Sequence, residues 1–230
     1  MSKKLFKDRL DAASQLFEIL PTERIYPEEW ILISLCPQAI PLAEAMAQKL
    51  HVKYDLLFCE PILAPSNLEC RIAMVSETEE IVLHPKLVES FGINLDFIYG
   101  EAHRKYEEKI LPKVYKYRKG DLISSIEGKN VLLIDEGCET GMTVLTATKT
   151  VIGLHAKSVT YATPVIPTDV ACALDPVIDE IFSVQKVSNF VDVAFYYSQL
   201  NELSSEEVVE IIKTSKHYFC LLYTSPSPRD

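Results

Sequence analysis

A segment near the middle of the chain carries two acids, two glycines and two threonines directly after a run of apolar residues. Residues 131–134 are apolar, Asp135 and Glu136 follow them, and a helix is expected from about Thr143. A helix start offers unpaired backbone N–H groups and a partial positive charge, so a phosphate binds well there. Glycine lets the backbone approach such an anion closely. We therefore predict phosphate contacts from the amides or hydroxyls of Gly137, Cys138, Thr140, Gly141, Met142 and Thr143.

The two acids suit a different part of the same ligand. Asp135 and Glu136 would repel a phosphate, but carboxylates accept hydrogen bonds and can bind the 2′- and 3′-hydroxyls of a ribose. Acids on one side and phosphate donors on the other fit a ribose 5-phosphate that lies along the loop. Thr143 is also expected to cap the helix. The plainer alternative is an ordinary strand-to-helix turn in which the acids occur by chance.

The elements that position this segment are predicted from apolar runs and helical spacing. Strands alternate with helices, so we expect an α/β fold with an open, mostly parallel sheet and helices on both faces. In such sheets, ligands bind beyond the carboxyl ends of the strands. A polar turn also predicts a hairpin. The expected strands are 30–35, 54–59, 130–134, 158–165 and 178–184, the hairpin strands are 71–76 and 80–84, and the helices are 6–20, 41–50, 102–114 and 143–151.

Composition disfavours several kinds of partner and site. The chain has 230 residues and a net charge of −10, which argues against nucleic acid and an anionic membrane surface. Its six cysteines form no C-x-x-C pair and its five histidines do not cluster beside them, so neither a zinc site nor a disulfide framework is expected. The start of the chain lacks a signal-peptide core, and no apolar run reaches the roughly 20 residues that span a bilayer. We expect a cytoplasmic protein with free thiols and no metal site built directly from protein ligands.

The length suits one large domain. We predict that residues 1–216 form a single domain with a small hood. Residues 217–230 end in a Ser-Pro repeat that continues nothing upstream. We predict that they are a non-native or disordered tail.

The central segment resembles the phosphoribosyl pyrophosphate (PRPP) motif of type I phosphoribosyltransferases, which has an apolar strand, two acids, three residues and then Thr-Gly-x-Thr. It is neither a P-loop nor a dinucleotide fingerprint, because Gly-Lys-Ser/Thr and G-x-G-x-x-G are both absent. Residues 6–9 are similar to the F-x-D-R opening of a subgroup of predicted phosphoribosyltransferases, and residues 64–77 to its A-P-G-N-P-E…I-G-A-V-A-E stretch. The likeness covers residues 6–215 and implies the type I fold, in which a small hood accompanies the sheet.

The resemblance implies a glycosyltransferase that transfers ribose 5-phosphate from PRPP to, or from, a nitrogenous base with pyrophosphate as the leaving group. It implies Mg²⁺ bound through PRPP, with PRPP or a nucleoside monophosphate and an acceptor base as ligands, and a homodimer as in many relatives. The catalytic candidates are Asp135, Glu136 and Glu139. Glu139 matches a position where some purine-salvage relatives have an acid near the base, and a solvated loop carboxylate is its alternative role.

One part of the family pattern is altered. The subgroup has P-R-G-G-V-P after its first strand to bind pyrophosphate, and residues 36–41 here lack the arginine and both glycines. We predict a degenerate pyrophosphate loop at Pro37, Gln38, Ala39 and Ile40. The subgroup's Arg-Lys after the second strand is replaced by Glu60 and Pro61.

Three basic residues are candidates to replace the lost positive charge, namely Arg71, Lys86 and Arg104. Two alternatives to an active enzyme also follow from the altered loop. One is a catalytically degenerate regulatory module that binds a nucleotide or ribose phosphate. The other is a scaffold that retains only the fold.

Overall fold

A five-stranded parallel sheet forms the centre of the structure, a computed structural model that describes residues 4–219. The strand order is β2-β1-β6-β7-β8. The order reverses between β1 and β6, and this switch point is where open α/β sheets bind their ligands. The strands are β1 (Trp30–Ser34), β2 (Lys53–Leu56), β6 (Asn130–Ile134), β7 (Ser158–Pro167) and β8 (Glu180–Val187).

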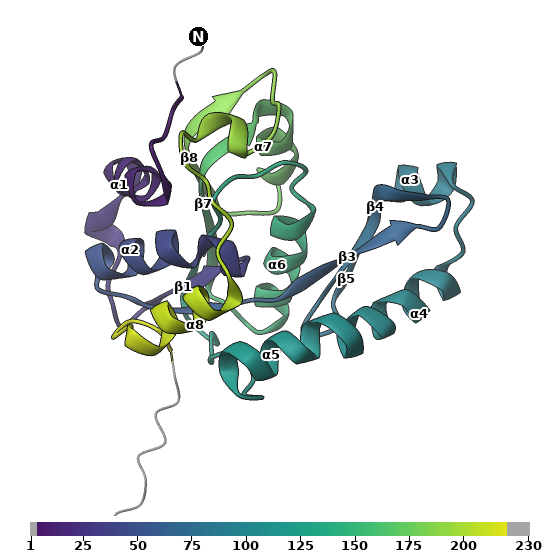
Figure 1. Cartoon of the computed structure of the whole chain (residues 1–230), viewed down its shortest axis with the longest axis horizontal. Coiled ribbons are helices and arrows are strands. Elements are labelled where there is room, and N and C mark those ends of the chain that lie inside the picture. Colours follow the sequence, from purple (N-terminus) through teal and green to yellow (C-terminus); the bar gives the residue numbers. More distant parts are fainter. Residues whose placement is uncertain (1–3, 220–230) are drawn as a thin grey trace, which may run out of the picture.

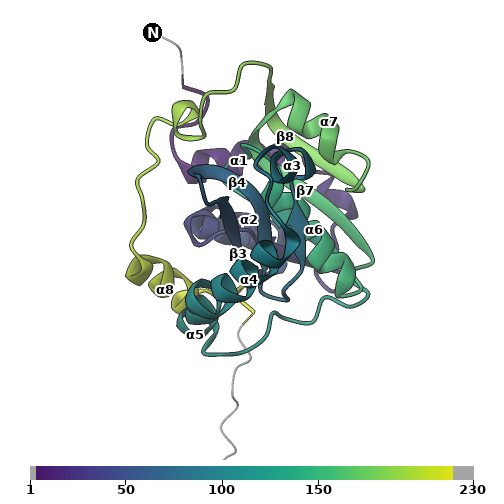
Figure 2. The same cartoon turned by 90° about the vertical axis from the view of Figure 1, so that its right-hand side faces the viewer.

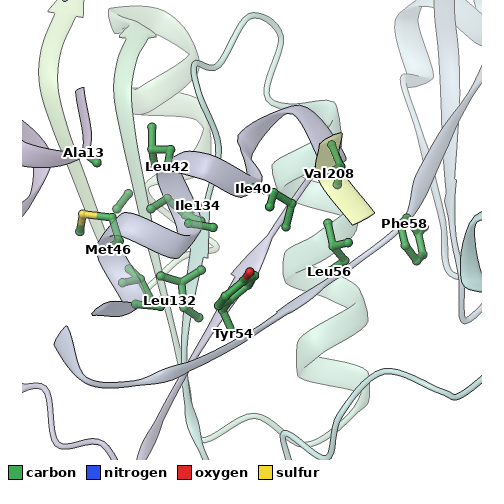
Figure 3. Packing of buried hydrophobic residues seen from close by; sticks show 14 of the residues in the cluster. Ala13, Ile40, Leu42, Met46, Tyr54, Leu56, Phe58, Leu132, Ile134 and Val208 are labelled. Carbon is green, nitrogen blue, oxygen red and sulfur yellow. The ribbon is translucent and has the colours of Figure 1, made fainter. Parts of the chain in front are cut away.

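Helices cover both faces of this sheet, as predicted. One face of the strands presents Leu32 and Leu132 to α1 and α2, and α8 packs on α2; Figure 3 shows Leu132 among these residues. The other face presents Ile33 and Leu133 to α6 and α7. Successive strand residues point to opposite faces, so a continuous apolar run serves both layers. The helices are α1 (Arg9–Ile19), α2 (Ile40–Leu50), α6 (Met142–Gly153), α7 (Thr168–Leu174) and α8 (Ser205–Thr214).

A separate hood extends from the sheet after β2 (Figures 1 and 2). Its antiparallel sheet has the order β3-β4-β5. The predicted hairpin is confirmed as β4 and β5. A long helical arm with a π-helical turn in its middle covers the hood. The hood elements are β3 (Cys59–Ala64), β4 (Asn67–Ser76), β5 (Ile81–Leu83), α3 (Pro85–Ser90), α4 (Leu95–Lys105), the π-helix Tyr106–Ile110 and α5 (Leu111–Arg118).

The predicted strand 54–59 was wrong at its carboxyl end, because the chain leaves the parallel sheet there. Leu57 still donates its amide to Ser34 at 3.0 Å. The amide of Phe58 instead donates to the Glu77 side chain at 3.1 Å, and the hood strand β3 begins one residue later. The apolar run therefore spans a joint between two sheets.

A buried ionic cluster lies at this joint. Arg118, the last residue of α5, forms an ion pair with Glu77, and their side chains are only 3% and 5% exposed. Asp55 is also buried and accepts a hydrogen bond from the Ser124 amide at 2.9 Å. Burial raises the pKa of both carboxyl groups, and the positive charge of Arg118 opposes that rise. Arg118 thus compensates two carboxyl groups that would otherwise be buried without a cation.

Residues 188–204 form a strap that returns from β8 to α8 and includes the 3₁₀ turn Ala194–Tyr196. The strap pairs with the amino-terminal segment, since the amide of Phe6 donates to Tyr196 at 3.0 Å and that of Ser198 donates back to Phe6 at 2.8 Å. Two further 3₁₀ turns are Thr22–Arg24 and Pro37–Ala39. Among the described residues, no helix has the length and apolarity needed to cross a membrane.

The first residues assigned to the tail belong to the folded part. Tyr54 donates its amide to His217 at 2.9 Å and accepts from the amide of Phe219 at 2.8 Å. Tyr218 is buried, and its ring packs edge-on against Tyr54 with centroids 5.3 Å apart. The predicted boundary at 216 thus falls too early, and residues 220–230 lie outside the described residues.

Candidate functional site

The acid- and glycine-rich segment forms a loop between the carboxyl end of β6 and the start of α6, beside the β1/β6 switch point. Gly141 is the N-cap of α6 and has φ +74°, a conformation that favours glycine. No side chain caps this helix, so the expectation that Thr143 does so is wrong. Thr143 lies inside the first turn, and its hydroxyl contacts the sulfur of Met74 in the hood at 3.6 Å.

The loop leaves several backbone amides without an acceptor. Within residues 4–219, the amides of Gly137, Glu139 and Thr140 donate to no backbone or side-chain oxygen, while that of Gly141 faces the Cys138 sulfur. The first turn of α6 adds N–H groups that a helix cannot pair internally. Glu139 and Thr140 are exposed at the loop tip. The loop therefore presents a set of free donors at a helix start.

Cys138 does not belong to this set of donors. Its amide donates to the carbonyl of Val165 at 2.9 Å, and its side chain is buried in the core beneath the loop. Cys138 was predicted as a binding residue, but its amide already has a partner. Its role is to hold the loop against β7.

Asp135 lies at the switch point. It contacts Cys36 in the segment after β1 and Glu136 in the segment after β6. Its Oδ1 accepts from the amide of Glu136 at 2.8 Å and from the Cys36 thiol at 3.4 Å. The surrounding protein removes the Asp135 carboxylate from water, and the negative charge of Glu136 lies beside it. Both effects, the first being the larger, raise the pKa of Asp135 to about 7. Asp135 can therefore carry or release a proton near neutral pH, a property common among functional carboxylates.

Glu136 is bound by a residue that the sequence reasoning did not assign to the site. Arg9 donates from Nε to Oε2 of Glu136 at 2.8 Å and from Nη1 to the carbonyl of Asn201 in the strap at 2.8 Å. The hydroxyl of Tyr197 donates to the main-chain oxygen of Glu136 at 2.7 Å. The F-x-D-R resemblance was the one sequence signal for Arg9, and it gave no hint of this partner.

The predicted degenerate pyrophosphate loop is a packed 3₁₀ turn, Pro37–Ala39, that runs directly into α2. Ala39 and Ile40 are fully buried. Gln38 is held by the strap, since its Nε2 donates to the carbonyl of Leu203 at 3.0 Å and its Oε1 accepts from the Leu203 amide at 2.8 Å. This turn presents no cationic side chain toward the switch point.

Two of the charged residues near the hood, Glu60 and Arg104, are also paired. Glu60, at the position of a family cation, forms an ion pair with Lys113 of α5. Arg104 is bound to Glu101 and Glu108 on the outside of the hood helix. Arg71 and Lys86 are exposed on hood elements. In the described part of the chain, Arg9 is the basic side chain that contacts the acid pair.

Gly137 makes the closest contact between the loop and the strap. A Cβ built at Gly137 would lie 2.7 Å from both methyl carbons of Val193. We expect Gly137→Ala to lower the free energy of unfolding by about 1–3 kcal/mol, because the strap must move away from the loop. Urea denaturation measures this loss. The double variant Gly137→Ala/Val193→Ala should recover part of it, and a double variant that is less stable than Gly137→Ala would show that the contact is misjudged.

A cavity of about 380 Å³ lies at the opposite edge of the sheet. Residues at the amino ends of the strands line it, including Trp30, Ser158 and Glu180. Its Arg24 is already bound to Glu180. The cavity is thus remote from the loop, and the charges of Arg24 and Glu180 compensate each other.

Comparison with known proteins supports the resemblance seen in the sequence. No family model matches the chain. Two Mycobacterium tuberculosis proteins, from strains CDC 1551 / Oshkosh and ATCC 25618 / H37Rv, are each 25% identical to it over 217 residues, which is 94% of this chain and 48% of theirs. Each is named a "putative phosphoribosyl transferase". The chain therefore spans about half the length of these curated relatives.

A solved structure shares the fold. The crystal structure of TT1426 from Thermus thermophilus has a TM-score of 0.72 and 24% identity, and the match covers 90% of this chain and 96% of that one. The sheet, the helices on both faces and the hood are those that the resemblance implied. The chain is thus similar over most of its length to two proteins named as putative phosphoribosyl transferases, and it shares its fold with TT1426.

Proposed function

We propose that this chain is a phosphoribosyltransferase that uses PRPP and transfers ribose 5-phosphate to a nitrogenous base, with pyrophosphate as the leaving group. One observation carries the proposal. The loop after β6 has free amides at a helix start and two carboxylates beside them, at the topological switch point of the sheet. Such amides bind phosphate, and such carboxylates bind ribose hydroxyls.

Each group in the loop then has a chemical role. The amides of Gly137 and residues 139–143 bind the 5′-phosphate, helped by the hydroxyl of Thr140. Asp135 and Glu136 accept hydrogen bonds from the ribose hydroxyls. The reacting ribose gains positive charge as pyrophosphate leaves, so the negative charge of Asp135 stabilises the transition state more than the ground state. Glu139 is exposed at the loop tip and serves as the acid/base near the incoming base.

Mg²⁺ would reach this site mainly on the substrate. Among the described residues, no group of three or more His, Cys, Asp and Glu side chains is arranged to hold a metal. Carboxylate and phosphate oxygens are the ligands that Mg²⁺ prefers, so PRPP together with Asp135 suits it better than protein groups alone. When bound, the ion would neutralise charge on the pyrophosphate.

A second function is favoured by the residues around the pyrophosphate position. Gln38 is bound to Leu203, and Glu60 takes up the charge of Lys113. One unit-charge contact at about 4 Å contributes roughly 4 kcal/mol at an effective dielectric of 20, so the missing cations weaken pyrophosphate binding considerably. These contacts favour a module that binds nucleoside monophosphate or ribose 5-phosphate without transfer.

One experiment separates the two functions. The protein is incubated with PRPP, Mg²⁺ and a panel of purine, pyrimidine and orotate acceptors, while pyrophosphate release is followed and nucleoside monophosphate affinity is measured by calorimetry. Release with any acceptor supports the transferase. Tight monophosphate binding by folded protein that releases no pyrophosphate supports the binding module. Neither binding nor release would refute both functions.

Thr140→Asp tests the phosphate contacts directly. Thr140 is exposed, so the substitution should leave the melting temperature nearly unchanged. Its new carboxylate should weaken ribose 5-phosphate binding by about 30-fold or more, because it stands among the donors to the phosphate. Glu139→Gln is the matched control in the same loop and should bind as tightly as the wild type or more so. Equal affinities for Thr140→Asp and the wild type would argue that the phosphate binds elsewhere.

A further inference from the structure

Two distant parts of the chain, the amino-terminal segment and the strap, converge on Glu136. Asp8 caps α1 through hydrogen bonds from the amides of Leu10 and Asp11, and this cap makes Arg9 the first helical residue. Arg9 is only 8% exposed and bridges Glu136 and the strap. Phe6, also buried, packs on the ring of Tyr197 at 5.0 Å, and Tyr197 donates to the main chain of Glu136.

The contact with Arg9 lowers the net negative charge of the loop. Two adjacent carboxylates beside a phosphate site would repel a dianionic ligand. The ion pair with Arg9 compensates Glu136, which leaves Asp135 as the uncompensated member of the pair. The other ionisable groups that face the two acids are Cys36, Glu139 and Tyr197, and none of them is a cation.

We propose that Arg9 is a positioning residue for ligand binding, which fixes the Glu136 carboxylate toward α1 and cancels its charge so that the loop accepts a phosphorylated ribose. The proposal rests on the phosphate site of the proposed function. Arg9 at the start of α1 thereby acts on Glu136, which lies 127 residues later in the sequence. A purely structural role for Arg9, as a link between α1 and the strap, is the competing explanation.

Charge rescue distinguishes these roles, with ribose 5-phosphate as the calorimetric probe. Arg9→Met should weaken binding on the order of tenfold or more, because Glu136 becomes an uncompensated anion. Adding Glu136→Gln to that variant removes the uncompensated charge but keeps a side-chain oxygen that can accept from a ribose hydroxyl. The double variant should therefore recover part of the loss, although the contact with Asn201 stays broken. A structural role predicts no such restoration, so a double variant that binds no better than Arg9→Met overturns the proposal.

Arg9→Lys covers the case in which Arg9→Met does not fold. It keeps the positive charge but loses the two-pronged geometry, and it should bind within a few-fold of the wild type. Binding by folded Arg9→Lys that is tenfold weaker or worse would overturn the charge role. No binding by the wild type would refute the proposed phosphate site and this inference with it, whereas wild-type affinity in Arg9→Met refutes this inference alone.

Discussion

Arg118→Met is expected to lower the free energy of unfolding by about 3–5 kcal/mol at pH 8, which is typical when one partner of a buried ion pair is removed. The guanidinium compensates Glu77 and Asp55 and lies 5.1 Å from the centre of the Phe58 ring. Its loss leaves two carboxyl groups buried without a cation, at the joint between the central sheet and the hood.

The loss should depend on pH. Burial already raises the pKa of Glu77 and Asp55, and removing Arg118 raises both further. A carboxyl group with a raised folded-state pKa favours the folded state at low pH, and that contribution is lost as the pH rises through its folded pKa. Arg118→Met should therefore be closer to the wild type at pH 5 than at pH 8.

Urea denaturation at the two pH values measures this effect. Arg104→Met is the matched control, because Arg104 makes exposed ion pairs with Glu101 and Glu108, which water screens, and its loss should change stability little. Arg118→Met/Glu77→Gln should recover part of the loss. Similar stabilities for the Arg118 and Arg104 variants would mean that the cluster at the joint does not hold the hood to the sheet.

Asp135→Asn is expected to stabilise the protein at pH 8 by about 2–4 kcal/mol. The pKa of Asp135 is raised from 3.8 to about 7, so the folded state holds its proton more tightly than the unfolded state does. Stability from this group is complete below about pH 4 and falls between pH 4 and pH 7. Asparagine does not ionise, so the variant should lack this fall.

Thermal melts at pH 4.5 and pH 8 test this expectation. The gain should be full at pH 8 and much smaller at pH 4.5, where Asp135 of the folded wild type keeps its proton and the pH is only just above the unfolded pKa of 3.8. Glu139→Gln removes a carboxylate from the exposed loop tip and serves as the control with little effect at either pH. A gain of equal size at both values would show that Asp135 is ordinarily acidic in the folded protein.

The same substitution should damage transfer. The charge of Asp135 is proposed to favour the cationic transition state, so Asp135→Asn should reduce kcat more than it weakens ribose 5-phosphate binding. Equal losses in both would refute that role. If Asp135→Asn both stabilises the protein and lowers activity, the ionised Asp135 carboxylate costs stability in order to serve function.

The parallel strands were predictable because each is a short run of apolar residues that both helix layers bury. Leu132 and Leu133 illustrate this, since they point to opposite faces of the sheet. Strand β3 was missed, because Glu60 and Pro61 interrupt its apolar pattern and its pairing with β4 depends on the hood. The sequence patterns also did not predict the short helix α7, or α8, which begins with a capping box at Ser204.

The candidate site was predictable only where it is local in sequence. The acids, glycines and threonines of residues 135–143 form the expected loop at the carboxyl edge of the sheet. Contacts between distant segments were not predictable, since nothing in one sequence pairs Arg9 with Glu136 or gives the Cys138 amide to Val165. The hydrogen bond from Gln38 to Leu203 likewise depends on the strap, whose sequence shows no helical or strand periodicity.

Amide chemical shifts during a titration with ribose 5-phosphate report whether the loop after β6 binds the phosphate, and ribose is the control that lacks the phosphate. We expect saturable shifts of the Gly137 amide and of the amides at 139–143 with the phosphorylated sugar, and much smaller shifts with ribose. Unchanged amides in this loop, or shifts confined to the cavity at the amino edge of the sheet, would contradict it.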